Sequence, residues 1–531
     1  MLKCKETMNL LHNKIFIILF LFNLNACQSG EIKKPGDEIL PKIISLSSSD
    51  GIAGDKIVIS GSGFNANSVV MFGSEKAVIV RISTTEIEVT VPPGQNNVVV
   101  QVYNGKLFSN SLNFSYKSPT PVITEISKEE GIENDTISIS GTNFNDESTV
   151  FFETNIARTK APIIDISPIK IRVKVPSISQ TGSMSVKVYN GKQESNSITF
   201  VLLASYVNPV FEPILADPTF IKDPVSGKFF AYGTADYWHT DNRSHLVAIV
   251  RSNDFTSWNY IRDAFNSRPV WKSESNAGIW APDINYINGK YYLFYSYSTW
   301  GDPDPGIGLA IADKPEGPFN DQGKLFLSSE INVRNSIDPL YFEENGKKFL
   351  FWGSYRNNSA ETNWGTFVVD LSEDGKSVID KSKIVKIAAS DFEGVVIHKR
   401  GNYYYFFGSR GGCCDGINST YHVLVGRSTS LKGPYYDKKG NDLAKVNGAG
   451  TLVLKGNSSF VGPGHASRII TDKGGNDWIL YHAMPNNSAL AQIGGVNQRA
   501  LMLDEVIWSD DGWPLINDGT PSYKRKPSPK F

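Results

Sequence analysis

One pattern occurs five times in residues 206–531, and it limits the fold more than any other feature of the sequence. Each copy has a titratable residue, an apolar strand, a turn that usually contains glycine, and an aromatic strand that ends on a polar residue. The leading residues are Asp217, Asp283, Asp338, Glu393 and His465, separated by 66, 55, 55 and 72 positions. Strand hairpins repeated every roughly 50–70 residues are typical of β-propeller blades. The pattern therefore predicts an all-β, five-bladed β-propeller.

The leading residues of the five copies are expected to meet. In a propeller, the equivalent position of each innermost strand faces one central channel, so four carboxyl groups and one imidazole gather at its mouth. Such a cluster is costly unless it is paired, solvated or used in chemistry, and close carboxylates raise the pKa of at least one of them. Two carboxyl groups with different pKa values can hydrolyse a glycosidic bond. For any single Asp, a turn residue or strand-start cap is the alternative.

Short motifs around these residues resemble glycoside hydrolase family 43, the five-bladed inverting hydrolases of arabinan and xylan. The motifs are Ala216-Asp217-Pro218, Trp280-Ala-Pro-Asp283, Ser336-Ile-Asp338-Pro339 and Phe392-Glu393-Gly394. A narrower resemblance, to the endo-α-1,5-L-arabinanase branch, lies in residues 411–421, Gly462-Pro-Gly-His465 and Asp511-Gly-Trp-Pro514. Each motif is weak by itself, but the ordered set covers residues 206–520.

The resemblance implies a role for each of three carboxyl groups. Asp217 matches the general base, Glu393 the general acid, and Asp338 the carboxylate that positions the acid and tunes its pKa. An inverting enzyme holds its acid and base about 6.5–9.5 Å apart, which leaves room for water. Gly394 is a departure, because the family often has proline after the acid, and glycine is expected to loosen this turn slightly.

Three further residues complete the predicted site. Trp280 is interpreted as a sugar-stacking surface, with a core position as the alternative, and Asp283 as a mainly structural residue that also contacts substrate. In arabinanases the residue matching His465 holds a hydrated ion, usually calcium. A calcium ion is therefore expected beside His465 within a water-rich shell, because calcium prefers oxygen ligands. The alternative for His465 is a core histidine, and no organic cofactor is expected.

Two adjacent cysteines follow the second strand of the fourth copy. Neighbouring Cα atoms lie ~3.8 Å apart, below the ~4.4 Å lower end for ordinary disulfides. Cys413 and Cys414 are therefore predicted to be packed thiols, one of which faces the cleft.

The first residues are typical of a targeting segment. Lysines precede an apolar run at 15–22, which is too short to span a bilayer, and Leu24-Asn25-Ala26-Cys27 resembles a bacterial lipobox. The resemblance implies a signal peptide over 1–26, a lipidated Cys27, and a membrane-anchored lipoprotein of the outer membrane or cell surface, with residues 27–40 as a tether. An ordinary secretory peptide is the alternative.

Two similar segments follow the tether. Residues 41–116 and 119–203 share their strand alternation and short motifs such as Val-Tyr-Asn-Gly-Lys, and both resemble IPT/TIG immunoglobulin-like domains. This pattern predicts two β-sandwiches. They carry no titratable cluster, so we interpret them as spacer or interaction modules, with glycan binding as the alternative.

The balanced charge bears on one class of partner. Lys+Arg is 53 and Asp+Glu is 54, which argues against a nucleic-acid binder. Together, the family resemblances imply a monomeric surface lipoprotein whose propeller cleaves α-1,5-linked L-arabinan internally. The alternatives are an exo-acting α-L-arabinofuranosidase or β-xylosidase on the same fold, and a non-catalytic glycan-binding lipoprotein. The presence of all three carboxyl positions argues against the last.

Overall fold

The computed structural model describes residues 39–272, 277–353, 355–356 and 363–531. The predicted signal peptide, Cys27 and nearly all of the predicted tether lie outside these residues. Within the described ranges, no helix is long and apolar enough to cross a bilayer. Helical structure there is limited to α1 (Ser488–Ala491) and three 3₁₀ turns, η1 (Ser328–Ile331), η2 (Lys381–Lys383) and η3 (Gly416–Asn418). The all-β prediction is confirmed.

The first sandwich packs two sheets around a core of aliphatic and phenylalanine side chains. One sheet has the order β1-β3-β7-β6 and the other β2-β10-β8-β4-β5, with β9 on β8. In β3, residues 57, 59 and 61 are buried and alternate with more exposed neighbours, as a half-buried strand requires. The strands are β1 (Lys42–Leu46), β2 (Asp50–Gly51), β3 (Lys56–Ser62), β4 (Val69–Phe72), β5 (Glu75–Lys76), β6 (Val78–Ile82), β7 (Glu86–Thr90), β8 (Asn97–Asn104), β9 (Leu107–Phe108) and β10 (Leu112–Tyr116).

The second sandwich has the same topology. Its sheets have the orders β11-β13-β17-β16 and β12-β20-β18-β14-β15, with β19 on β18. Alternation in β13 again buries every second residue, and the prediction of two immunoglobulin-like sandwiches is confirmed. The strands are β11 (Val122–Ile126), β12 (Glu130–Gly131), β13 (Thr136–Thr142), β14 (Ser148–Glu153), β15 (Arg158–Lys160), β16 (Ile163–Ser167), β17 (Lys170–Lys174), β18 (Gly182–Asn190), β19 (Gln193–Glu194) and β20 (Ile198–Leu202).

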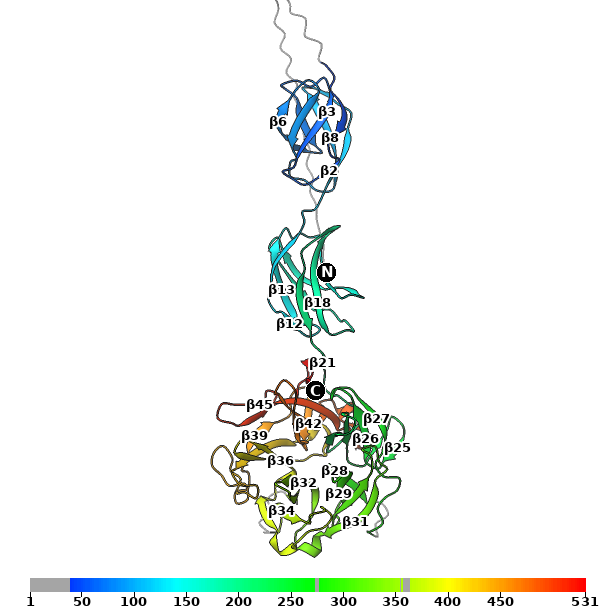
Figure 1. Ribbon diagram of the computed structural model, residues 1–531, viewed down its shortest axis with the longest axis vertical. Coiled ribbons are helices and arrows are strands. Elements are labelled where there is room, and N and C mark those ends of the chain that lie inside the picture. The colour runs from blue at the N-terminus through cyan, green and yellow to red at the C-terminus, as the bar shows by residue number, and fades with distance from the viewer. Residues whose placement is uncertain (1–38, 273–276, 354, 357–362) are drawn as a thin grey trace, which may run out of the picture. The chain divides into compact units, whose positions relative to one another are not determined.

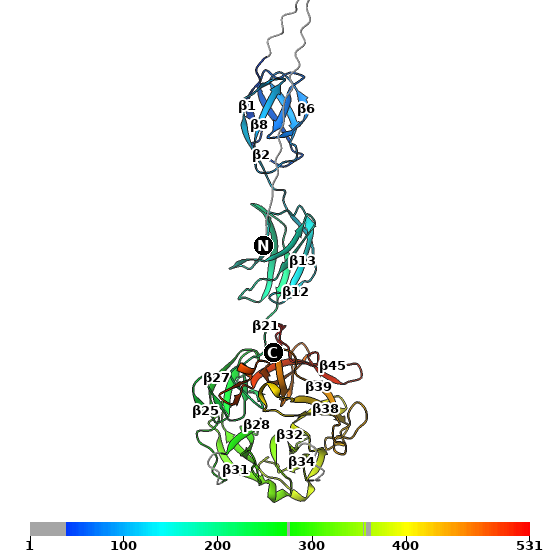
Figure 2. The same ribbon diagram turned by 180° about the vertical axis from the view of Figure 1, so that it is seen from behind.

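The rest of the described chain forms five successive antiparallel sheets, the blades of a propeller. Figures 1 and 2 show β28 and β32 toward the middle of the ring and β31 at its rim. Blade one is β22 (Thr219–Lys222), β23 (Phe229–Tyr232), β26 (Ala248–Ser252) and β27 (Trp258–Asp263); blade two is β28 (Gly278–Ile287), β29 (Lys290–Ser298), β30 (Gly306–Ala312) and β31 (Asn320–Leu327); blade three is β32 (Ile337–Glu344), β33 (Lys347–Gly353), β34 (Thr366–Leu371) and β35 (Val385–Ala388).

Blade five differs from the others because two strands share its innermost place. Blade four is β36 (Glu393–Arg400), β37 (Tyr403–Arg410), β38 (His422–Ser428) and β39 (Thr451–Leu454); blade five is β40 (Phe460–Gly464), β42 (Asp477–Pro485), β45 (Ala500–Trp508) and β46 (Pro514–Ile516), with β41 (Ile469–Thr471) also on β42. Three short ribbons complete the domain: β21 (Ser205–Tyr206) with β47 (Lys526–Pro527), β24 (Asp236–Trp238) with β25 (Arg243–His245), and β43 (Gln492–Ile493) with β44 (Val496–Asn497).

The first residues of the propeller close the ring against its last blade. The backbone N–H of Val210 donates to Leu501 O at 2.9 Å, and the N–H of Leu215 donates to Arg499 O at 3.0 Å. Asn208 donates to Leu503 O at 2.8 Å and accepts from Leu503 N at 2.9 Å. The chain entering blade one therefore pairs with β45 of blade five, which joins the first and last blades of the ring.

Candidate active site

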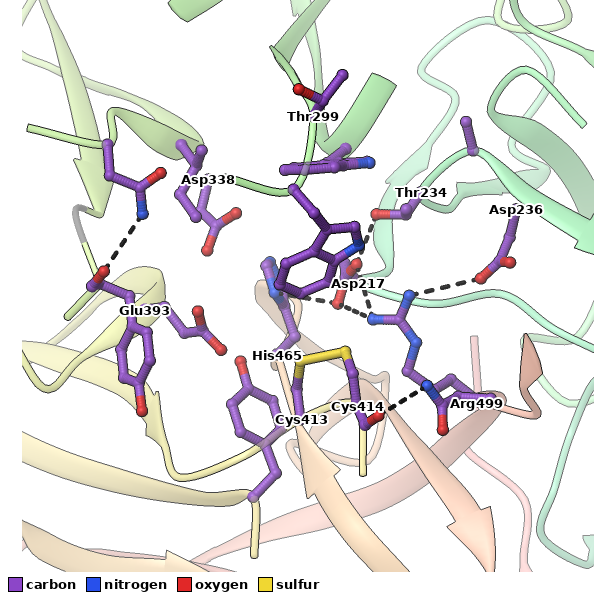
Figure 3. Close-up of a pocket in the computed structure, with 18 of the residues that line it drawn as sticks. Asp217, Thr234, Asp236, Thr299, Asp338, Glu393, Cys413, Cys414, His465 and Arg499 are labelled. Carbon is purple, nitrogen blue, oxygen red and sulfur yellow. Dashed lines mark hydrogen bonds and ion pairs between the residues drawn. A yellow bond between two sulfur atoms is a disulfide. The ribbon is translucent and has the colours of Figure 1, made fainter. Parts of the chain in front are cut away.

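A cleft of about 590 Å³ lies at the mouth of the channel, and all three predicted catalytic carboxyl groups line it. Figure 3 shows Asp217, Asp338 and Glu393 directed toward one space, with His465 next to Asp217. Residues from all five blades contribute to its wall. The convergence expected from the repeat is therefore present for these four side chains.

Each blade has a left-handed residue in or beside its innermost strand, near the mouth of the channel. These residues are Asp217 (φ 51°), Ala281 (φ 40°), Asp338 (φ 57°), Gly394 (φ 60°) and His465 (φ 48°). In blades two, three and four the residue lies within a bulge of the first hairpin ladder, which bends the strand and re-aims its side chains. For residues other than glycine this conformation costs about 1–3 kcal/mol, and such strain clusters at functional sites.

A polar group from the preceding blade holds the backbone N–H of each left-handed residue. Three of the acceptors are hydroxyl groups at 2.8 Å: Thr234 Oγ1 accepts from Ala281 N, Ser296 Oγ from Asp338 N, and Ser409 Oγ from His465 N. The other two acceptors are Asp338 Oδ2, which accepts from Gly394 N at 3.0 Å, and His482 Nδ1, which accepts from Asp217 N at 3.1 Å. In four of the five steps, the polar residue that ends the aromatic strand of the sequence repeat thus joins one blade to the next. Between blades three and four, the leading residue Asp338 has this role.

Asp217 lies among cations and hydrogen-bond donors. Arg499 Nη1 is 3.1 Å from both carboxylate oxygens, Thr234 Oγ1 donates to Oδ2 at 2.5 Å, and His465 Nδ1 is 3.3 Å from Oδ1. Burial alone would raise the pKa of this carboxyl group. The charge of Arg499, with a smaller contribution from His465, outweighs burial and holds the pKa of Asp217 well below its usual range. Asp217 is therefore ionised and can accept a proton from water.

Glu393 and Asp338 have raised pKa values, in contrast to the lowered pKa of Asp217. Burial raises the pKa of Glu393 to about 7; the charge of Asp217 adds to this effect and a hydrogen bond from Tyr421 opposes it. Burial likewise raises the pKa of Asp338 to about 7, with His465 opposing and Glu393 and Asp217 adding to the shift. A carboxyl group that keeps its proton near neutral pH can protonate a leaving oxygen.

Gly394 links these two carboxyl groups. Its N–H donates to Asp338 Oδ2, so Asp338 fixes the turn that carries Glu393. A proline at this position has no N–H to donate. A Cβ built on Gly394 would approach the His465 ring to 3.1 Å, and the positive φ also favours glycine. Glycine therefore fits the turn through a hydrogen bond and close packing, whereas we expected it to loosen the turn.

The structure contradicts the expected substrate contact of Asp283. Ala281, two residues earlier, takes the left-handed position of blade two. Asp283 is 3% exposed and lies outside the cleft lining. Its carboxylate accepts hydrogen bonds from Arg468 Nη1 at 2.5 Å, from Arg468 Nη2 at 2.7 Å and from the backbone N–H of Tyr341 at 2.7 Å. Arg468 also donates to Tyr341 O at 2.8 Å. Asp283 thus joins blades two, three and five below the mouth, and its position in the motif is structural.

Trp280 lies where the cleft meets a second hollow. Its ring centroid is 5.8 Å from that of Trp300, which is 83% exposed. A hollow of about 420 Å³ shares Trp280, Trp300, Thr299 and Asp236 with the cleft, so the groove continues beyond the carboxyl groups on the side of blades one and two. Aromatic faces of this kind suit the apolar C–H faces of sugars. The stacking role of Trp280 stays a prediction.

The prediction of two packed thiols is wrong, because Cys413 and Cys414 form a disulfide. The prediction rested on the Cα spacing of ordinary bridges, but both sulfur atoms here point to the same side of the chain, at the edge of the cleft (Figure 3). The segment is held by Asn497, whose Nδ2 donates to Cys414 O at 3.0 Å and whose Oδ1 accepts from Gly416 N at 3.0 Å. The pair faces the cleft as expected.

His465 offers a single imidazole toward the cleft, and it already lies beside Asp217. Among the described residues, no group of three or more His, Cys, Asp or Glu side chains is arranged to hold a metal ion. A calcium ion at His465 would therefore have to take most of its ligands from water, as the sequence prediction supposed.

Sequence reasoning missed two residues that contact Asp217, Arg499 and His482. Arg499 was interpreted only as part of the strands that close the ring, and a lone arginine before an apolar strand has no feature that marks it. His482 did carry a signal, because it ends the fifth copy where the others have smaller polar residues. Burial lowers the pKa of His482, and its Nδ1 accepts from Asp217 N–H, which describes a neutral imidazole with its proton on Nε2.

A propeller whose mouth holds an ionised carboxylate together with carboxyl groups that keep their protons near neutral pH is suited to the hydrolysis of glycosidic bonds. The family model described as Glycosyl hydrolases family 43 matches residues 206–514, more than half of the chain. The protein belongs to glycosyl hydrolase family 43. The IPT/TIG domain model matches residues 41–116 and 121–202.

Individual relatives cover the propeller. The extracellular endo-alpha-(1->5)-L-arabinanase 1 of Bacillus subtilis (strain 168) is 33% identical over 313 residues, which cover 57% of this chain and 87% of the relative. The extracellular exo-alpha-(1->5)-L-arabinofuranosidase ArbA of Cellvibrio japonicus is 28% identical over 324 residues, covering 56% of this chain and 86% of the relative. The solved structure of a GH43 endo-arabinanase from Bacillus licheniformis is 27% identical, covers 57% of this chain and 98% of its own, and has a TM-score of 0.47.

Proposed function

We propose that the protein hydrolyses α-1,5-linked L-arabinan at internal bonds. The observation that carries the chemistry is the contrast between Asp217, whose pKa lies well below its usual range, and Glu393, whose pKa is raised to about 7. The substrate class follows from the relatives, whose names describe arabinan-cleaving enzymes.

In the proposed reaction, Asp217 takes a proton from a water molecule, which attacks the anomeric carbon from the face opposite the leaving group. Glu393 gives its proton to the glycosidic oxygen as the bond to the anomeric carbon breaks, so the configuration inverts. Arg499 keeps Asp217 ionised before the attack, and Asp338 holds the turn that aims Glu393. Proton transfer to or from the solvent then restores both carboxyl groups.

Internal cleavage requires a groove that continues on both sides of the carboxyl groups. The second hollow beyond Trp280 and Trp300 supports this on one side, and the segment with Cys413 and Cys414 borders the cleft elsewhere. Linear 1,5-arabinan is expected to give a ladder of oligosaccharides and a rapid fall in viscosity, with inverted anomeric configuration by NMR. Arabinose as the main product from the earliest time point, at constant viscosity, would contradict internal cleavage.

Exo action is the second candidate, and the loop that carries Trp300 favours it. This loop is fastened to its surroundings, because Lys272 Nζ lies 2.5 Å from Asp302 Oδ2 and Ser329 Oγ donates to Asp304 Oδ2 at 2.8 Å. A rigid loop can close one end of a groove. The Cellvibrio japonicus relative also bears an exo name. The same product analysis separates the two candidates.

The anchor is a separate part of the proposal, and its support is the lipobox-like Leu24-Asn25-Ala26-Cys27. Lipidation of Cys27 would hold the enzyme at the outer membrane or cell surface, with the two IPT/TIG domains as spacers. A Cys27→Ser variant is expected to lose incorporation of labelled fatty acid and to leave the membrane fraction. Label retained on the variant would overturn this assignment.

The calcium ion beside His465 is also a proposal, supported by the imidazole facing the cleft. Calcium added to chelator-treated protein is expected to raise the melting temperature of the wild type and not that of His465→Ala. An equal change in melting temperature for the two proteins would contradict a calcium site at His465.

A further inference from the structure

A second aromatic pocket lies on blade four, outside the catalytic cleft. It encloses about 410 Å³ and shares no lining residue with the cleft. We call it the blade-four pocket and define it by Tyr403, Arg427, Tyr436 and Trp513, which all line it. Nothing in the proposed catalytic reaction uses these side chains.

The blade-four pocket lies at the opposite end of its blade from the active site. Strand β37 starts at Tyr403 and reaches Ser409, whose hydroxyl accepts from His465 N at the mouth of the channel. In the antiparallel neighbour β38, His422 pairs with Arg410 near the mouth and Ser428 pairs with Tyr404 at the other end. Six residues of strand at ~3.3 Å each place the pocket about 20 Å from the mouth. It is therefore a separate site.

Its side chains combine flat apolar faces with unused donors. Tyr436 is 42% and Tyr403 37% exposed. The Arg427 guanidinium lies 4.6 Å from the Tyr403 ring centroid and 4.5 Å from that of Trp513. Its Nη1 donates to Asp511 O at 2.8 Å, and within the described ranges its other guanidinium N–H groups make no hydrogen bond. A guanidinium fixed between rings can bind two adjacent hydroxyl groups of one ligand.

The charges of the pocket cancel. Lys438 pairs with Asp511 at 2.7 Å. The Asp437 carboxylate accepts from two backbone N–H groups at 2.9 Å each and from two further donors at 3.0 and 3.1 Å, so it is already satisfied. Arg427 is thus balanced within the pocket, and the chemistry favours a neutral, hydroxyl-rich ligand over an anion.

We propose that the blade-four pocket binds a second segment of a neutral polysaccharide, with one sugar ring stacked on Tyr436 and its hydroxyl groups on Arg427. That this polymer is arabinan rests on the proposed function. Binding here would keep the enzyme on a long chain between cleavage events and would leave short oligosaccharides unaffected, because they cannot occupy both sites.

The binding test uses the full chain with Glu393→Gln, which prevents hydrolysis. Its migration is followed in gels that contain linear arabinan, xylan or polygalacturonate. Adding Tyr436→Ala is expected to raise the apparent dissociation constant for the neutral polymer about three- to tenfold, because one stacking face is lost. Tyr436→Phe is expected to keep the affinity, and so is Tyr523→Ala, a control on a 52% exposed tyrosine outside the pocket.

Unchanged retardation by neutral polymers in Tyr436→Ala would overturn the proposal, and so would salt-sensitive binding to polygalacturonate alone. Tyr436-dependent retardation by xylan but not arabinan would keep the site and overturn the proposed substrate. In the active enzyme, Tyr436→Ala is expected to raise KM for the polymer and to leave kcat/KM on arabinotriose unchanged. An equal loss on both substrates would indicate a folding defect and would contradict the pocket assignment.

Discussion

The two sides of the cleft carry carboxyl groups of the same chemistry, yet the pKa values of these groups are shifted in opposite directions. On the side of blade one, the pKa of Asp217 lies well below its usual range. On the side of blades three and four, the pKa values of Asp338 and Glu393 rise to about 7. Burial would raise all three, so the difference comes from charge: Arg499 contacts only Asp217 among them. One cation placed outside the repeated pattern thus separates base from acid.

Removing the base is expected to have the largest effect. Asp217→Asn keeps the size of the side chain but cannot accept the proton of water, so kcat/KM should fall about 10⁴-fold, at the upper end for one acid–base group. Initial rates on linear arabinan and on an aryl arabino-oligosaccharide should fall alike, because both reactions need the activated water. Asp236→Asn, a neighbouring carboxylate of Arg499, is the matched control and should lose far less. A loss confined to the polymer would contradict the base assignment.

Removing the acid should have a substrate-dependent effect. Glu393→Gln cannot protonate the leaving oxygen, so kcat/KM on linear arabinan should fall about 10²–10³-fold. An aryl arabino-oligosaccharide has a leaving group that needs little protonation, and its rate should fall less than about tenfold. Equal losses on the two substrates would assign Glu393 another role.

The carboxyl groups on the two sides should also affect the stability of the folded protein with opposite signs. The raised pKa of Glu393 lies above the ~4.3 of an unfolded chain, so the native protein loses stability as the pH rises from about 4 through about 7. Glu393→Gln should remove this loss and stabilise the protein at pH 8 by on the order of 1–3 kcal/mol, with little change at pH 4. Asp217, with its lowered pKa, contributes stability above ~3.9 that is lost as the pH falls.

Asp217→Asn should therefore destabilise the protein at pH 8, opposite in sign to Glu393→Gln. Thermal unfolding of both variants at pH 4 and pH 8 measures this pair of effects. The same sign for both at pH 8 would show that burial, rather than Arg499, governs the two groups.

The smallest effect on catalysis is expected from Asp283. Its carboxylate joins blades through Arg468 and Tyr341, so Asp283→Asn should lower the melting temperature while KM and kcat change less than about threefold. A rise in KM at unchanged melting temperature would restore the substrate contact that the structure contradicts.

The sequence repeat predicted the five blades and the convergence of Asp217, Asp338, Glu393 and His465, because a hairpin repeat determines which strand ends meet. It misplaced Asp283, because a bulge moves the position at the mouth to Ala281 and such a shift has no marker in the apolar pattern. Arg499 lies outside the repeat and 282 positions from its partner Asp217, so only the closed ring brings them together. The bridge between Cys413 and Cys414 depends on local side-chain direction, which Cα spacing does not determine.

The pH dependence of kcat/KM in the wild type and in Arg499→Met tests most directly whether one cation separates base from acid. The wild type should show an alkaline limb with an apparent pKa near 7, shared by Glu393 and Asp338, and an acid limb below the usual range of a carboxyl group. In Arg499→Met the acid limb should move strongly upward, whereas the alkaline limb should move upward only slightly, because Arg499 is the smallest of the influences on the pKa of Glu393. An acid limb that does not move would contradict the account.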